Sequence, residues 1–342
     1  MGHCNVRSDA VSRNNLNIDS ICLVCGQSNW KNLYAVKDTN QGVPGTWSII
    51  QCVECDLAML HPMPENHEIE AFYNENFYTS ESSRFNATVE KIRELIAYVR
   101  TKRIHKLAPE GKTLLDFGAG AGHFGKIMEK AGWRVVNVDI SNTASGGTKK
   151  SSLIMDADRP ILDFSDNSFD VVTLWYVIEH MRNPRKVLEE MKRVLRPKGI
   201  LLLAQQNFDS YQARYFGTRW LILDPPRHLY QFSPKNLRCL AEHMGFQCVA
   251  VEHESLEMGP FTILQSTLNT LLGNRNYLFR YLKDRRLKVA NSLSGNGLRD
   301  ELMAWISLGL ALCLFPLSVA AYYILLYFDS GDVFTLYASN EK

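Results

Sequence analysis

Between residues 113 and 253 the chain alternates short apolar runs with longer stretches in which apolar residues recur every three or four positions. Short apolar runs are typical of buried parallel strands, and the wider spacing is typical of amphipathic helices. This pattern predicts an α/β fold. The predicted strands are 113–117, 134–140, 152–155, 169–175, 200–204 and 246–253, and the predicted helices are 86–107, 123–132, 185–195 and 233–244.

A second pattern is the apolar segment 302–328, which contains no Asp, Glu, Lys or Arg. It is long enough to cross a bilayer, but Pro316 lies near its middle. A helix over residues 302–315 would reach only about 21 Å, less than the roughly 30 Å of a hydrocarbon core. We therefore expect a re-entrant helical hairpin or a kinked helix in the membrane plane. The alternative is a buried helix pair or a dimer interface.

The segment before it, residues 276–288, mixes apolar residues with five Lys and Arg side chains. Such a cluster attracts anionic lipid headgroups, although an ordinary solvated helix surface has the same composition. The 342 residues carry a net charge of only +2, which gives no reason to expect a nucleic-acid-binding face. The polar N-terminus lacks the apolar core of a secretory signal, so we expect it to lie in the cytoplasm.

Two Cys-x-x-Cys pairs lie near the N-terminus, Cys22 with Cys25 and Cys52 with Cys55. Four thiolates in this arrangement complete a tetrahedral Zn²⁺ site, and the strand-like residues between the pairs are typical of a zinc ribbon. Because four cysteines leave no open coordination position, the predicted zinc is structural. The alternative is a set of structural or redox thiols without metal.

The candidate chemistry begins at residues 112–141, which read as strand, glycine-rich turn, helix and strand. Gly118, Gly120 and Gly122 would let a ligand approach the main-chain N–H groups, and Asp139 is placed to accept hydrogen bonds from ribose hydroxyls. Asp116 precedes the first glycine, so the motif reads D-x-G-x-G-x-G.

This motif and the following segments resemble the class I S-adenosylmethionine-dependent methyltransferases. The resemblance covers about residues 88–255 and 330–340. It implies a seven-stranded Rossmann-like sheet whose antiparallel seventh strand is residues 332–338, so that a helical insertion interrupts the last hairpin. The implied cofactor-binding residues are Asp116, Gly118, Ala119, Gly120, Gly122, Asp139, Ile140, Asp156, Ala157 and Trp175. Asp156 has the alternative of being an ordinary loop carboxylate.

Glu179 and His180 follow the predicted strand 169–175 at the carboxyl edge of the sheet, where ligands bind in open α/β sheets. A histidine there can take a proton from a hydroxyl nucleophile. His228, in the long segment 209–234, is a second candidate because similar family members carry a Pro-x-His sequence near the acceptor. The alternative is that Glu179 and His180 only tie down the loop.

We therefore expect a flexible tail (1–18), a zinc ribbon (19–64), an aromatic and helical connector (65–110), a methyltransferase domain (111–255 and 330–342) and a membrane-associated insertion (256–329). The leader before the domain resembles a group of bacterial zinc-ribbon methyltransferases. The expected reaction is methyl transfer to an amphiphilic acceptor, such as a lipid-linked saccharide or a polyprenyl quinone or phenol, at the cytoplasmic face of the membrane. The alternatives are a cytoplasmic enzyme for a soluble molecule, with the apolar segment as an oligomer interface, and a non-catalytic membrane scaffold.

Overall fold

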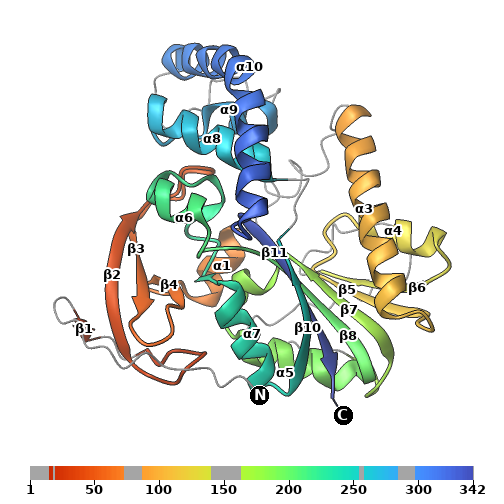
Figure 1. Ribbon diagram of the computed structural model, residues 1–342. Coiled ribbons are helices and arrows are strands. Elements are labelled where there is room, and N and C mark those ends of the chain that lie inside the picture. Colours follow the sequence, from red (N-terminus) through yellow and green to blue (C-terminus); the bar gives the residue numbers. More distant parts are fainter. Residues whose placement is uncertain are drawn as a thin grey trace.

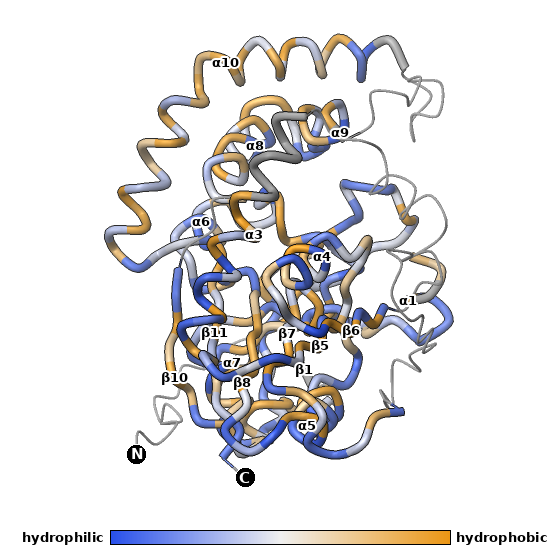
Figure 2. The backbone as a smooth tube through the Cα atoms, turned by 90° about the vertical axis from the view of Figure 1, so that its right-hand side faces the viewer, coloured by the Kyte–Doolittle hydropathy of each residue, from blue (hydrophilic) through white to orange (hydrophobic). Residues whose placement is uncertain are grey.

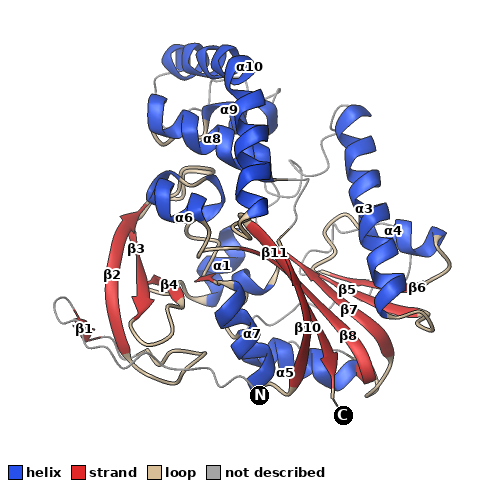
Figure 3. Cartoon of the chain, in the orientation of Figure 1, coloured by secondary structure: helices blue, strands red, loops and turns tan. Residues whose placement is uncertain are grey.

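The computed structural model describes residues 15–17, 20–72, 87–139, 163–253, 258–283 and 297–341. Within these residues two sheets stand side by side, and a group of helices caps one end of the molecule (Figures 1 and 3).

The larger sheet has the strand order β10-β11-β8-β7-β5-β6 in the described residues. Strands β6, β5, β7 and β8 pair in parallel, and β11 lies antiparallel between β8 and β10. This is the predicted α/β architecture with an inserted antiparallel last strand. The predicted strand 152–155 lies outside the described residues. The strands are β5 (Thr113–Phe117), β6 (Arg134–Val138), β7 (Phe169–Trp175), β8 (Leu195–Gln206), β10 (Phe246–Glu252) and β11 (Val333–Asn340).

Helices cover both faces of this sheet because successive strand residues point to opposite sides. Leu114 packs with α3 (Ala87–Leu107) and α4 (His123–Lys130), whereas Leu115 packs with α5 (Pro184–Val194) and α7 (Pro234–His243). All four helices therefore fall where the apolar spacing predicts them.

Local sequence signals fix the starts of two of these helices. The side chain of Asn183 accepts a hydrogen bond from the N–H of Lys186 ahead of Pro184 in α5. Ser233 and Asn236 form a reciprocal capping box at the start of α7. Strand β8 begins directly after α5 and is longer at both ends than the predicted residues 200–204.

The smaller sheet is antiparallel, with the order β1-β2-β3-β4-β9. Its last strand, β9, comes from the segment that follows β8, far along the chain. The buried apolar residues of this sheet form one continuous cluster with those under α5 and α7. The strands are β1 (Asn15–Asn17), β2 (Asn29–Val36), β3 (Trp47–Cys52), β4 (Ala58–His61) and β9 (Tyr230–Gln231), and α1 (Asn66–Phe72) follows β4.

The cap consists of α8 (Gly259–Leu272), α9 (Tyr277–Lys283) and α10 (Gly297–Tyr327), inserted between β10 and β11 as predicted. Helix α10 arches over α8 and α9 and then bends down toward β11 (Figures 1 and 2). It runs through Pro316 as a single bent helix. The segment is therefore a single bent helix and not a hairpin, and its position in the membrane plane stays a prediction.

Candidate functional site

The glycine-rich turn between β5 and α4 has the backbone that its sequence requires. Gly118, Gly120 and Gly122 have φ values of 77°, 53° and 70°, in the region that favours glycine. The N–H of Gly118 donates to the carbonyl of Val138 at 2.7 Å, which holds the turn against β6. A Cβ on Gly118 would lie 2.3 Å from a methyl group of Val177, so no larger residue fits there.

The sequence predicts that this turn binds S-adenosylmethionine, so replacing Gly118 with alanine is expected to weaken that binding at least about tenfold. An alanine in this left-handed conformation costs roughly 1–2 kcal/mol and clashes with Val177, so the free turn is expected to relax to another conformation, and binding would have to restore the original one at about that cost. Titration calorimetry of the folded variant measures the effect. Gly132→Ala is the matched control, because Gly132 has a φ of 89° but open space around it and lies at the far end of α4. Equal cofactor affinity in the Gly118 and Gly132 variants would contradict a role for the turn.

The two predicted carboxylates flank this turn. Asp116 is buried in β5 and accepts a hydrogen bond from the Thr173 hydroxyl at 2.7 Å. Burial raises the pKa of Asp116 to about 7. At the end of β6, Asp139 accepts a hydrogen bond from the N–H of Gly120 at 2.7 Å. The glycine turn and Asp139 therefore form one connected unit.

Trp175, the last residue of β7, stands on the other side of the turn. Its ring packs edge-on against Phe124, and the guanidinium of Arg100 lies 4.1 Å from the ring centroid. Arg100 also lowers the pKa of Asp116, against the stronger effect of burial. The sequence pattern did not single out Arg100, because a lone arginine in a helix has no distinguishing signal. Ala119 lies in the turn, where its N–H donates to the Val138 carbonyl, while Ile140, Asp156 and Ala157 lie outside the described residues.

The structure brings Glu179, His180 and His228 together at the carboxyl edge of the sheet. Glu179 and His180 lie in the short helix η1 (Ile178–His180) after β7, and the rings of His180 and His228 are 4.8 Å apart in an edge-to-face arrangement. The three side chains offer ligand atoms within 4.8 Å of one another, so the cluster has the chemistry to handle a proton or to hold a cation.

The hydrogen bonds of the cluster orient both imidazole rings. His180 Nδ1 lies 2.9 Å from the carbonyl oxygen of Arg227, so it carries the proton and Nε2 keeps its lone pair. His180 Nε2 is 4.0 Å from a carboxylate oxygen of Glu179. His228 Nδ1 is 2.9 Å from the side-chain amide of Gln206, at the end of β8. Gln206 is a further candidate that sequence reasoning missed.

Burial sets the charge of this cluster. It raises the pKa of Glu179 to about 8 and lowers the pKa of His180. Burial also lowers the pKa of His228 to about 3, assisted by the neighbouring His180. Both histidines are therefore neutral near pH 7. Among the residues that the structure describes, neither carboxylate oxygen of Glu179 reaches a partner at hydrogen-bond geometry, although its side chain is completely buried.

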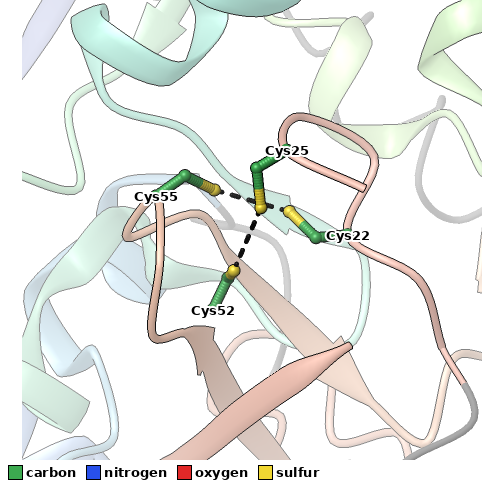
Figure 4. Close-up of side chains that lie close together, drawn as sticks. All are labelled: Cys22, Cys25, Cys52 and Cys55. Carbon is green, nitrogen blue, oxygen red and sulfur yellow. Dashed lines mark hydrogen bonds between the residues drawn. The ribbon is translucent and has the colours of Figure 1, made fainter. Parts of the chain in front are cut away.

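The four predicted metal-ligating cysteines converge in the smaller sheet, two from the turn before β2 and two from the turn after β3 (Figure 4). The sulfurs of Cys22 and Cys55 are 3.4 Å apart, and those of Cys25 and Cys52 are 3.5 Å apart. Four thiolates at about 2.3 Å from a tetrahedral Zn²⁺ would be about 3.8 Å from one another. The cluster is therefore close to the geometry of such a site.

Comparison with known proteins agrees with this architecture. Residues 88–251 match a protein family described as "Methyltransferase domain". Together with the strand order and the glycine motif, this match supports a class I S-adenosylmethionine-dependent methyltransferase domain in residues 88–251.

Among similar curated proteins is a ubiquinone biosynthesis O-methyltransferase of Actinobacillus pleuropneumoniae, 28% identical over 136 residues, which are 36% of this chain and 58% of that protein. A demethylmenaquinone methyltransferase of Renibacterium salmoninarum is 32% identical over 127 residues, which are 34% of this chain and 54% of that protein. The chain thus spans little more than half the length of these two relatives. A solved structure of a SAM-dependent methyltransferase from Archaeoglobus fulgidus aligns with 78% of this chain and all of its own, at 18% identity and a TM-score of 0.43.

Proposed function

We propose that this protein transfers a methyl group from S-adenosylmethionine to a hydroxyl or similar nucleophile of an amphiphilic acceptor taken from the membrane. A polyprenyl quinone or phenol is the leading acceptor class, since relatives are named for ubiquinone and menaquinone pathways, and a lipid-linked saccharide is the second. The observation that carries the proposal is the joint position of the glycine turn and the Glu179–His180–His228 cluster at one edge of the sheet.

The cofactor site is supported by the fit of the turn. The position of Gly118 leaves no room for a side chain, and the indole N–H of Trp175 is buried without a hydrogen-bond partner in the described residues. In this proposal the turn holds the amino-acid end of S-adenosylmethionine, Asp116 positions its amino group and Asp139 holds the ribose. When bound, the cofactor supplies an electrophilic methyl group on its sulfonium.

The acceptor needs a group that receives its proton as its oxygen becomes bonded to the methyl carbon. His180 meets the requirement, because its Nδ1–H is held by the Arg227 carbonyl and its neutral Nε2 has a lone pair. His228 is the second candidate, held by Gln206. Excluding water and holding the nucleophile in line with the methyl group would supply most of the rate enhancement.

Membrane association is supported by the side chains on α10. The face of α10 that packs inward carries mainly small or polar residues, namely Ala304, Ser307, Ala311 and Ser318, together with the one large buried side chain of Tyr322 and the half-buried Leu308 and Leu314. Large apolar side chains point outward instead, among them Leu312 at 76% exposure and Leu317 at 66%. A soluble helix normally has the opposite arrangement. Small residues at the helix contact and large apolar residues outside are typical of helices that contact lipid.

The helix also has the length and composition of a membrane-crossing segment over Arg299–Tyr327, where only 22% of an apolar window of 18 residues is buried. Since α10 lies across α8 and α9 and returns to the central sheet, we propose that it lies on the membrane, at its cytoplasmic face, rather than crossing it. We also propose that Cys22, Cys25, Cys52 and Cys55 bind a structural Zn²⁺.

Replacing His180 with alanine is expected to leave S-adenosylmethionine affinity unchanged and to lower methyl transfer by about 100-fold or more, the usual contribution of a general base. The assay follows radiolabel from the cofactor into a total lipid extract and, separately, into a soluble metabolite extract. A base must be unprotonated, so the wild-type rate should fall with decreasing pH only below about 6.5, because burial lowers the pKa of His180.

His105→Ala is the control for this variant, since His105 lies in α3 against Trp133, away from the acceptor edge. Wild-type turnover in the His180 variant would exclude it as base and leave His228. Label in soluble molecules alone would retain the enzyme and overturn the lipid acceptor. Absence of cofactor binding in the wild-type protein would overturn the proposed function as a whole.

A further inference from the structure

The segment that carries His228 is held by hydrogen bonds to two parts of the molecule, η1 and strand β4. On one side the N–H of Leu229 donates to the carbonyl of Glu179 at 2.8 Å. On the other side the carbonyl of Leu229 accepts a hydrogen bond from Leu60 in β4, also at 2.8 Å. The next two residues then pair with β4 as strand β9. Only Leu229 therefore separates His228 from β9, the last strand of the cysteine-containing sheet.

A buried ion-pair network makes the second connection. The guanidinium of Arg227 is 1% exposed and donates two hydrogen bonds of 3.0 Å to the carboxylate of Asp38, which is fully buried in the β2–β3 loop. Arg227 also donates from Nε to Asp224 at 2.8 Å. Two planar contacts of this kind fix the orientation of an arginine in a way that a lysine or a water could not reproduce.

Asp38 is itself held rigidly. Its carboxylate accepts hydrogen bonds from the main-chain N–H groups of Asn40, Gln41 and Val43, at 2.8, 3.0 and 3.1 Å. The side chain of Asn40 in turn donates to Asp224. The β2–β3 loop is thus folded around the carboxylate of Asp38, which also accepts the hydrogen bonds of Arg227.

Arg227 connects this ion-pair network to both histidines. Its main-chain carbonyl accepts the Nδ1–H of His180, which fixes the tautomer of that ring, and His228 is its neighbour in the chain. The charges around this arginine come from Asp38 and Asp224, and these carboxylates raise the pKa of Arg227 against the effect of burial. The guanidinium therefore stays charged.

We propose that Asp38 is a positioning residue for the acceptor site. Through its ion pair with Arg227 it sets the positions of His180 and His228. The cysteine-containing sheet then helps to position the residues of that site, in addition to folding as a unit of its own. This inference rests on the proposed function for its meaning in catalysis, but the placement of the two rings can be measured without any acceptor.

The experiment uses the full-length protein with ¹³C- and ¹⁵N-labelled histidine and the variant Asp38→Asn, which keeps the shape of the side chain and removes its charge. The ring resonances of His180 and His228, assigned with the single variants His180→Gln and His228→Gln, are expected to shift, and those of His105 to stay in place. S-adenosylmethionine affinity should change less than about twofold, while methyl transfer falls about 10- to 100-fold, the usual effect of a misplaced reacting group.

Glu65→Gln is the matched control. Glu65 pairs with Arg182 at 2.8 Å, which also joins the segment after β4 to the residues after η1, but Glu65 is 62% exposed and does not touch Arg227. This variant should match the wild type in every readout. If Asp38→Asn does not fold, Asn40→Ala is the second variant. It removes the side-chain hydrogen bonds of Asn40 with Asp224 and Asn276, leaves the ion pair between Asp38 and Arg227 in place, and should shift the same two histidines to a smaller extent.

Unchanged His180 and His228 resonances in a folded Asp38→Asn protein would overturn the inference. Resonance shifts with wild-type turnover would also overturn it, since the placement of the rings would then not matter for transfer. If the wild-type protein transfers no methyl group at all, the proposed function fails, while the histidine spectra still report whether Asp38 sets the positions of the two rings.

Discussion

Replacing Cys52 with serine is expected to remove bound zinc and to unfold the smaller sheet around β2, β3 and β4. Structural zinc sites of this type contribute on the order of 10–16 kcal/mol to the free energy of folding. A small sheet that loses this contribution is expected to unfold. The four sulfurs lie in the two turns that begin β2 and end β3, so their release frees both strands. Elemental analysis should give one zinc per wild-type chain and none in the variant, and hydrogen exchange should show loss of protection in β2–β4.

The same variant separates the two halves of the proposed site. The glycine turn belongs to the larger sheet, so cofactor binding should persist, whereas β9 loses its partner β4 and methyl transfer should fall below detection. Cys313→Ser is the control, because Cys313 is an exposed cysteine on α10. Retention of one zinc in the Cys52 variant, or unchanged protection of β2–β4, would contradict a four-cysteine metal site.

Much of the fold could be predicted because its signals are local. Each strand of the parallel sheet is a short apolar run, and the turn needs three residues that tolerate positive φ, which glycine supplies. The caps at Asn183 and Ser233 are equally local. The position of strand β11 was also predictable, since only one β-rich segment follows the insertion.

The remaining features depend on contacts between distant segments. Strand β9 has two residues and no pattern of its own, and it exists because β4 offers it an edge. Asp38 lies in an ordinary polar loop, and only its burial against Arg227 gives it a role. Helix α10 continues through Pro316 because its contacts with α8 and α9 offset the lost hydrogen bond and the ring clash at the proline.

The position of the cap relative to the acceptor edge links the two proposals. Helix α10 returns to the sheet through Asp332, whose carbonyl accepts the N–H of Asn207 at 2.7 Å at the end of β8. Gln206, the neighbour of Asn207, contacts His228. The apolar outer surface of α10 and the histidine cluster are therefore connected through the ends of β8 and β11.

Replacing Leu312 and Leu317 together with glutamate is expected to release the protein from lipid vesicles. Both side chains are more than 60% exposed, so the folded protein should lose little stability. Burying a leucine in an apolar environment contributes roughly 1.5–3 kcal/mol, so losing two and adding two charges should weaken partitioning by at least about 100-fold. Co-sedimentation with vesicles that contain anionic lipid measures this directly.

The control for this double variant is Val249→Glu, which changes an apolar residue that is 50% exposed on the edge strand β10, away from the cap. It should bind vesicles like the wild type. Vesicle binding that survives in the double variant would contradict a lipid-facing α10. Failure of the wild type to bind vesicles, with a dimer that the double variant loses, would assign the outer face of α10 to a second copy of the chain. In that case the large side chains that point away from α8 would pack against protein instead of lipid, and the acceptor would have to reach the histidines from solution.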